Sequence, residues 1–152
     1  MAVNYWKNGE RMPCEMANGY ILDSSALIAL MEEEEGHETV ADLLRQEKII
    51  IPYIVLMEVY YISLRESGQQ EADRRWAMIK RLPVEFVWEI DEATVRTAAR
   101  FKALHRVSFA DAIIAAYAKS FNVILVHKDP EYESLAGEVE LLALPFKGTL
   151  ME

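Results

Sequence analysis

The sequence predicts an α/β fold, a three-layer sandwich around a mainly parallel, five-stranded sheet with strand order 3-2-1-4-5. Short apolar runs such as 20–22 and 123–126 are typical of parallel strands that are covered by helices on both faces. These runs alternate along the chain with helical segments, as they do in folds built from strand–helix–strand units. Because crossovers are right-handed, few topologies remain, and the preferred order places the first and fourth strands side by side.

The length of 152 residues suits one domain, which we expect at residues 19–152 after an amino-terminal extension, 1–18, of uncertain structure. No apolar run approaches the length of a membrane span, and the first 19 residues lack the apolar centre of a secretory signal. Cys14 is the single cysteine, so no internal disulfide can form. We therefore expect a cytoplasmic protein without membrane contact.

The net charge of −9, taken alone, argues against a nucleic-acid binder. Residues 65–106 nevertheless carry a net charge of +2, from nine Lys or Arg against seven Asp or Glu. A basic cluster with no acid inside it ends this region, and its members are Arg96, Arg100, Lys102, His105 and Arg106. The cluster is either a solvated helix face or a surface that contacts phosphates.

The first predicted strand, 20–22, runs directly into Asp23, and a helix follows at 25–31. The acidic run 32–35, with Gly36, indicates an exposed helix end or loop. The next helix is expected at 39–46, where Val, Leu and Leu fall on one side. His37 is expected in the loop before that helix, without a metal-ligand spacing to any partner.

The second strand is expected at 49–51 and ends at Pro52, a residue that suits the first turn of a helix. The helix that follows, 54–64, is apolar or small at every position except Glu58. A lone carboxylate in a buried helix is costly unless it is paired or binds a metal. The alternative is that Glu58 faces solvent along a narrow strip or reaches Arg65.

The second half of the chain continues the alternation. A polar helix is expected at 68–82, and a strand with half-exposed alternation at 84–90. Asp91 caps a helix that runs to about Leu104. Ser108 and Asp111 then open an apolar helix, 112–118. The last two strands are predicted at 123–126 and 139–142.

Four acids are expected to converge at the carboxyl edge of the sheet, where ligands bind in open α/β folds. They are Asp23 and Asp129 at the ends of neighbouring strands, Asp111 in the first turn of a helix, and Glu58. Like charges so close repel, and oxygen-only ligands favour Mg²⁺ or Mn²⁺. Helix capping is the alternative role, since Asp23 or Ser24 can cap one helix and Ser108 with Asp111 matches a capping box.

These segments together resemble the PIN-domain family, including VapC-type toxins. The resemblance spans residues 20 to about 144 and rests on the order and spacing of four motifs. They are Ile21-Leu22-Asp23-Ser24-Ser25-Ala26-Leu27, Glu58 in its apolar helix, Ser108-Phe109-Ala110-Asp111-Ala112, and Asp129-Pro130-Glu131-Tyr132. A departure lies at His127, where many members of the family carry Thr or Ser.

The resemblance implies a flavodoxin-like sheet and a Mg²⁺- or Mn²⁺-dependent ribonuclease that hydrolyses RNA phosphodiester bonds. The metal and catalytic residues it implies are Asp23, Glu58, Asp111 and Asp129. It also assigns Ser25 to the ordering of the site. His127, two residues before Asp129, is expected to affect that ordering, and the alternative is a histidine that is simply hydrogen-bonded beside a buried strand. Arg96, Arg100, Lys102 and Arg106 are the residues expected to contact RNA. A homodimer and an antitoxin protein are the implied partners.

Three other metal or phosphate sites fit less well. An adhesion-type Asp-x-Ser-x-Ser site is incomplete here, a dehalogenase-type phosphatase requires a second Asp at position 25, and a receiver domain requires an Asp after the third strand. The remaining alternative is a catalytically silent PIN-like module that binds RNA or a protein.

Overall fold

A computed structural model describes residues 5–7, 10–12 and 18–146. Its centre is a five-stranded, all-parallel sheet in the order β5-β4-β3-β6-β7. The strands are β3 (Tyr20–Leu22), β4 (Ile49–Pro52), β5 (Glu85–Val87), β6 (Ile124–His127) and β7 (Leu141–Ala143). Counted from β3, this is the predicted order 3-2-1-4-5, so the predicted fold class is confirmed.

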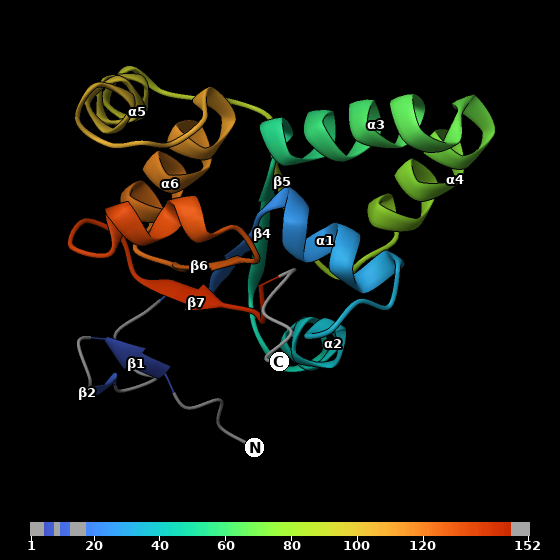
Figure 1. Cartoon of the computed structure of the whole chain (residues 1–152), viewed down its shortest axis with the longest axis horizontal. Helices are drawn as coiled ribbons and strands as arrows, with labels where there is room; N and C mark the ends of the chain where they lie inside the picture. Colours follow the sequence, from blue (N-terminus) through green and yellow to red (C-terminus); the bar gives the residue numbers. More distant parts are fainter. Residues whose placement is uncertain (1–4, 8–9, 13–17, 147–152) are drawn as a thin grey trace, which may run out of the picture.

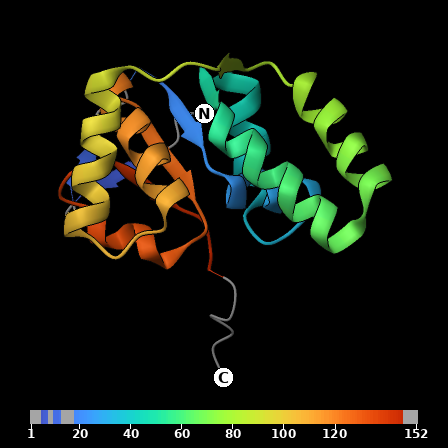
Figure 2. The same cartoon turned by 90° about the horizontal axis from the view of Figure 1, so that it is seen from above.

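Helices cover both faces of the sheet (Figures 1 and 2). Figure 2 shows α1 to α4 on one side of the strands and α5 with α6 on the other. The helices are α1 (Ser24–Met31), α2 (His37–Gln46), α3 (Tyr53–Ser67), α4 (Gln69–Lys80), α5 (Glu92–Leu104) and α6 (Phe109–Phe121), and a 3-10 helix, η1 (Pro130–Leu135), follows β6. The crossover from β5 back to β6 places α5 and α6 on the second face.

The middle strands form the core because both of their faces are covered. Ile21 and Leu22 of β3, Ile51 of β4, and Leu125 and Val126 of β6 are fully buried. Burying each such side chain contributes roughly 1.5–3 kcal/mol before chain entropy is subtracted. The β3–β6 register pairs Leu22 with Val126, so the residues that follow these two strands emerge next to each other.

Several element boundaries differ from the prediction. Pro52 is the last residue of β4 and pairs with Val87, so it precedes α3 instead of lying in its first turn. β5 lies at the edge of the sheet and pairs with β4 alone. Because the last pair is Pro52 with Val87, β5 ends at Val87 and is shorter than the predicted 84–90. His37 begins α2 instead of preceding it, because Gly36 adopts φ +95° at the N-cap. Its N–H donates to the carbonyl of Glu34.

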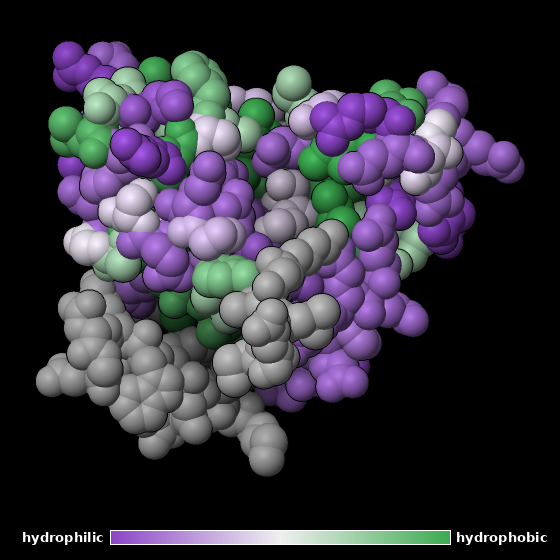
Figure 3. All heavy atoms as spheres, viewed as in Figure 1, coloured by the Kyte–Doolittle hydropathy of each residue, from purple (hydrophilic) through white to green (hydrophobic). Residues whose placement is uncertain are grey.

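The amino-terminal extension contains two paired strands, β1 (Tyr5–Lys7) and β2 (Glu10–Met12), which form an antiparallel ladder separate from the main sheet. The boundary at residues 18 and 19 stays a prediction. Figure 3 shows a mainly hydrophilic face with hydrophobic spots over the α3–α4 and α5–α6 regions. Over the described part of the chain, no helix has both the length and the apolar character needed to cross a membrane.

Candidate metal centre

Asp23 lies at the carboxyl end of β3, and its backbone N–H donates to the carbonyl of Val126 in β6 at 3.1 Å. The carboxylate Oδ1 accepts hydrogen bonds from the Ser25 hydroxyl at 2.6 Å and from the Ala26 N–H at 2.9 Å. Asp23 therefore caps α1, as the helix-capping interpretation predicts. It is also only 2% exposed, and burial raises its pKa to about 7. A capping acid on the surface would instead remain ionised at low cost.

The Ser25 hydroxyl joins the ends of the two central strands. It donates to Asp23 and accepts the backbone N–H of Lys128 at 2.9 Å. Lys128 is itself buried, with its ammonium bonded to the Glu34 carboxylate at 3.2 Å and to the Glu35 carbonyl at 2.9 Å. Lys128, the residue before Asp129, is thus tied both to Ser25 in the first turn of α1 and to the loop after α1. The ordering role expected of Ser25 stays a prediction.

Asp111 is placed by the first turn of α6. Ser108 is the N-cap, and its hydroxyl oxygen accepts the Asp111 N–H at 3.1 Å, so one half of the expected capping box forms. The Asp111 carboxylate points elsewhere, since its Oδ1 accepts the hydroxyl of Tyr132 at 2.9 Å. The side chain is 6% exposed. Burial is the main cause that raises its pKa to about 6, and the negative charges of Asp129 and Glu58 add to it.

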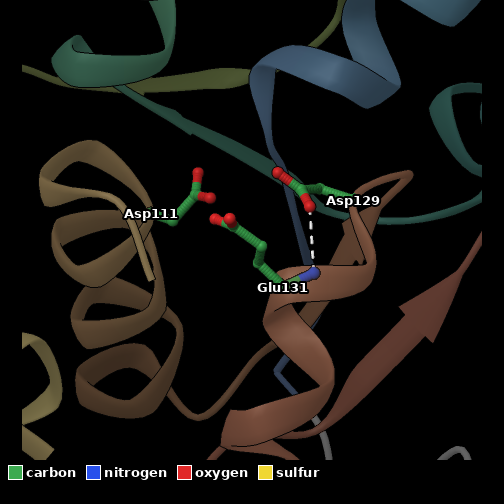
Figure 4. Close-up of side chains that lie close together, drawn as sticks. All are labelled: Asp111, Asp129 and Glu131. Carbon is green, nitrogen blue, oxygen red and sulfur yellow. Dashed lines mark hydrogen bonds between the residues drawn. The ribbon is translucent and has the colours of Figure 1, made fainter. Parts of the chain in front are cut away.

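Three carboxylates form the tightest group. One oxygen each from Asp111, Asp129 and Glu131 lies within 4.8 Å of the others (Figure 4). Asp129 is the N-cap of η1, and its Oδ1 accepts the Glu131 N–H at 2.9 Å. Figure 4 shows the Glu131 carboxylate directed toward Asp111 across the space between η1 and α6.

Glu131 was absent from the predicted site residues, although it belongs to the Asp129-Pro130-Glu131-Tyr132 motif. A signal for it exists in the sequence. Proline favours the first position of a helix, so Pro130 predicts a helical turn that begins just after Asp129. Such a turn places Glu131 at the N-terminal end of the helix, next to Asp129, its N-cap.

Glu58 completes the group from α3. Its Oε1 accepts the hydroxyl of Ser24 at 2.9 Å, and burial raises its pKa, with a further contribution from the charge of Asp129. Arg65, the alternative partner, instead lies near Glu66 and the ring of Tyr61. The negative charges of Asp111 and Glu58 in turn raise the pKa of Asp23. All four predicted acids therefore lie within electrostatic reach of one another.

The character of the group suits a hard divalent cation. Its donors are carboxylate oxygens from the residue that follows β3, from α3 and α6, and from the N-cap and first turn of η1, with no cysteine among them. The pKa values of Asp23, Glu58 and Asp111 are raised chiefly by burial and further by the neighbouring acids, so ionising these groups destabilises the fold without a counter-charge. Oxygen ligands of this kind favour Mg²⁺ or Mn²⁺ over zinc.

His127 is the last residue of β6 and is fully buried. Neither ring nitrogen has a hydrogen-bond partner among the described residues, and the Glu133 carboxylate is 3.9 Å away. Burial lowers the pKa of His127 to about 4, so the ring is neutral at pH 7. Its ring centroid lies 4.8 Å from that of Tyr132. His127 thus packs against Tyr132 and also lies within reach of the charge of Asp129. An ordering role for it stays a prediction.

The basic cluster lies on α5 and the turn after it. Arg100 pairs with Glu138 at 3.1 Å, and the Lys102 ammonium donates to the Val107 carbonyl at 2.8 Å. Arg96 and Arg106 are exposed, with no ion pair within the described ranges. Their expected contact with RNA stays a prediction, and Arg96 and Arg106 are the pair best placed to test it.

Comparison with known proteins supports the resemblance. The PIN domain family matches residues 20–138. No curated protein matches the chain. Among solved structures, VapBC2 from Rickettsia felis bound to a promoter DNA fragment has a TM-score of 0.68 at 15% identity, covering 83% of this chain and 98% of that one.

Two further solved structures are similar. VapC20 from Mycobacterium tuberculosis, described as a Sarcin-Ricin loop cleaving toxin, has a TM-score of 0.63 at 17% identity and covers 79% of this chain and 95% of its own. VapBC-1 from nontypeable Haemophilus influenzae has a TM-score of 0.63 at 19% identity, with coverages of 82% and 96%. At these identities the likeness shows the fold.

Proposed function

The chain belongs to the PIN domain family, and from this premise we propose that it is a Mg²⁺- or Mn²⁺-dependent ribonuclease, the toxin of a toxin–antitoxin pair. The observation that carries the proposal is the meeting of Asp23, Glu58, Asp111 and Asp129, four acids from separate elements, at the carboxyl edge of the sheet. Metal-dependent nucleases require such a set, because the carboxylates bind the cation that neutralises the negative charge of the phosphodiester.

The residues of the site divide into ligands and supports. Asp111, Asp129 and Glu131 are the closest set and would hold the cation, with Asp23 and Glu58 beside them. When bound, the cation activates a water molecule and stabilises the charge that develops on the phosphate and the leaving oxygen.

Two serine hydroxyls orient acids of the site. The hydroxyl of Ser25 holds Asp23, and that of Ser24 holds Glu58. Each acid would therefore face the cation in a fixed orientation.

RNA would approach with its phosphates along the basic cluster of α5. Exposed Arg96 and Arg106 supply charge in a protein that is otherwise acidic, and Arg100 and Lys102 lie on the same segment. Phosphate contacts of this kind strengthen binding at low salt and weaken it steeply as salt rises.

The toxin assignment is supported by the kind of solved structure that resembles this chain. Several come from toxin–antitoxin complexes, including the Rickettsia felis protein and one from Klebsiella pneumoniae. We expect an antitoxin protein as the natural inhibitor and a homodimer as the unit that binds it. Growth arrest on expression of the chain, relieved by co-expression of the protein encoded beside it, would test the first expectation. Sedimentation of the purified chain would test the second.

The activity itself is tested by incubating purified protein with structured RNA in Mn²⁺ or in EDTA. We expect cleavage in Mn²⁺, none in EDTA, and loss by orders of magnitude in Asp129→Asn. Asp42→Asn is the matched control, since Asp42 is an exposed acid of α2 that pairs with Arg45. RNA binding without cleavage by the wild type would instead favour the catalytically silent module.

A further inference from the structure

The tyrosine that contacts Asp111 is unusual among the buried groups near the site. Tyr132 is fully buried in η1, and its hydroxyl donates to Asp111 Oδ1 at 2.9 Å. Asp111 belongs to α6, twenty-one residues earlier in the chain. The segment that begins at Asp129 thus supplies two of the closest carboxylates and also the donor that contacts the third.

The hydrogen bond limits how Asp111 can be oriented. A carboxylate has two oxygens that can accept hydrogen bonds or bind a cation. The Tyr132 hydroxyl takes one acceptor position of Oδ1 and so favours one orientation of the carboxylate, while an Asp111 oxygen lies within 4.8 Å of oxygens of Asp129 and Glu131. A tyrosine hydroxyl keeps its proton near neutral pH, so it stays a donor when Asp111 is ionised.

The ring of Tyr132 is held in place by a second aromatic side chain. Its ring packs against the imidazole of His127, with centroids 4.8 Å apart and the planes tilted by 52°. His127 is the last residue of β6, two residues before Asp129. The aromatic pair therefore couples the position of the hydroxyl to the same strand end that positions Asp129.

We propose that Tyr132 is a positioning residue whose hydroxyl fixes the Asp111 carboxylate so that one of its oxygens can join Asp129 and Glu131 around the cation. The proposal rests on the proposed function for the presence of a cation at this site. It adds that part of the affinity for that cation depends on a group that does not touch it. Hydrogen-bonding partners of metal ligands typically contribute about ten- to a hundredfold to metal affinity.

The test is Tyr132→Phe, which removes only the hydroxyl and leaves a ring of the same shape, so the variant keeps its packing against His127. The matched control is Tyr117→Phe, because Tyr117 is equally buried and its hydroxyl donates to the carbonyl of Glu89, away from the acids. Mn²⁺ affinity is measured by calorimetry, and thermal melts in EDTA with circular dichroism monitor the fold.

We expect the Mn²⁺ dissociation constant of Tyr132→Phe to rise about tenfold or more, while that of Tyr117→Phe stays within twofold of wild type. In an Asp111→Asn background the same change should add nothing, because Tyr132 acts through Asp111. Unchanged Mn²⁺ affinity in Tyr132→Phe, or equal weakening in both phenylalanine variants, would overturn the assignment. A wild type that binds no Mn²⁺ would instead overturn the proposed function.

Discussion

The Asp111→Asn variant tests whether this acid acts as a helix cap or as part of a charged site. The substitution keeps the size of the side chain and an oxygen that can accept the Tyr132 hydroxyl, and it removes the negative charge. In the folded protein the pKa of Asp111 is raised from 3.8 to about 6, chiefly by burial. Its ionised form therefore destabilises the metal-free fold.

The size of this effect follows from the shift in pKa. Each unit corresponds to about 1.4 kcal/mol, so full ionisation of Asp111 costs at most about 3 kcal/mol. Because the folded pKa lies above the unfolded one, the contribution of Asp111 to stability is fully present below pH 3.8 and is lost as the pH rises through 6. At pH 8 we expect Asp111→Asn to stabilise the metal-free protein by about 1–3 kcal/mol, or roughly 2–12 °C in Tm.

The assay compares thermal melts of wild type and variant at pH 8, first in EDTA and then in Mn²⁺. Mn²⁺ should raise the Tm of wild type more than that of Asp111→Asn, because the variant lacks one ligand charge. RNA cleavage should fall by orders of magnitude. A capping acid would behave oppositely: the variant would be about 0.5–1 kcal/mol less stable. That loss, with a normal response to Mn²⁺ and near wild-type cleavage, would refute the argument.

Three other perturbations have defined outcomes. Asp23 has a folded pKa of about 7, above its unfolded value, so the metal-free protein should gain stability from it as the pH falls from 8 to 6. The pKa of His127 is lowered to about 4, so this residue partly offsets that gain below pH 6.5. Urea titrations in EDTA that show no gain in stability, or an equal gain in Asp23→Asn, would contradict the prediction for Asp23. Ser25→Ala leaves the Lys128 N–H without its acceptor and should cost about 1 kcal/mol while weakening Mn²⁺ binding, as melts and calorimetry would measure. Reversing Arg96 and Arg106 to Glu should weaken RNA binding at low salt and leave Mn²⁺ affinity intact, and filter binding that finds unchanged RNA affinity would assign this face to solvation.

The sheet could be predicted because its strands are short apolar runs whose burial decides their place. Ile21 and Leu125 are fully buried in strands whose two faces are both covered, and helix-forming segments of the right length separate these strands. The strand order then placed Asp23 beside Asp129 without knowledge of any side chain. Local sequence was sufficient wherever one rule acted alone, as in the Ser108 cap of α6.

The finer features of the site depend on contacts between distant segments. That Glu58 accepts a hydroxyl from Ser24 follows from how α3 packs beside α1, thirty-four residues away. The bond from Tyr132 to Asp111 requires η1, a 3-10 helix without a long periodic pattern to predict it. His37 and Pro52 were misplaced by one element each, because Gly36 and the pairing with β5 set those boundaries.

The concentration of site groups in residues 127–132 has a consequence for dynamics. Lys128, Asp129, Glu131 and Tyr132 all contribute through this one short segment. Proteins open locally in cooperative units. The short helix η1 is a contiguous segment of this kind, held by its Asp129 cap and by the buried side chains of Tyr132 and Leu135. Fraying of η1 would dismantle the ligand set while the sheet stayed folded. A cation bound by the closed form would suppress that opening, so hydrogen exchange at the amides of η1 should slow in Mn²⁺ far more than exchange in the central strands.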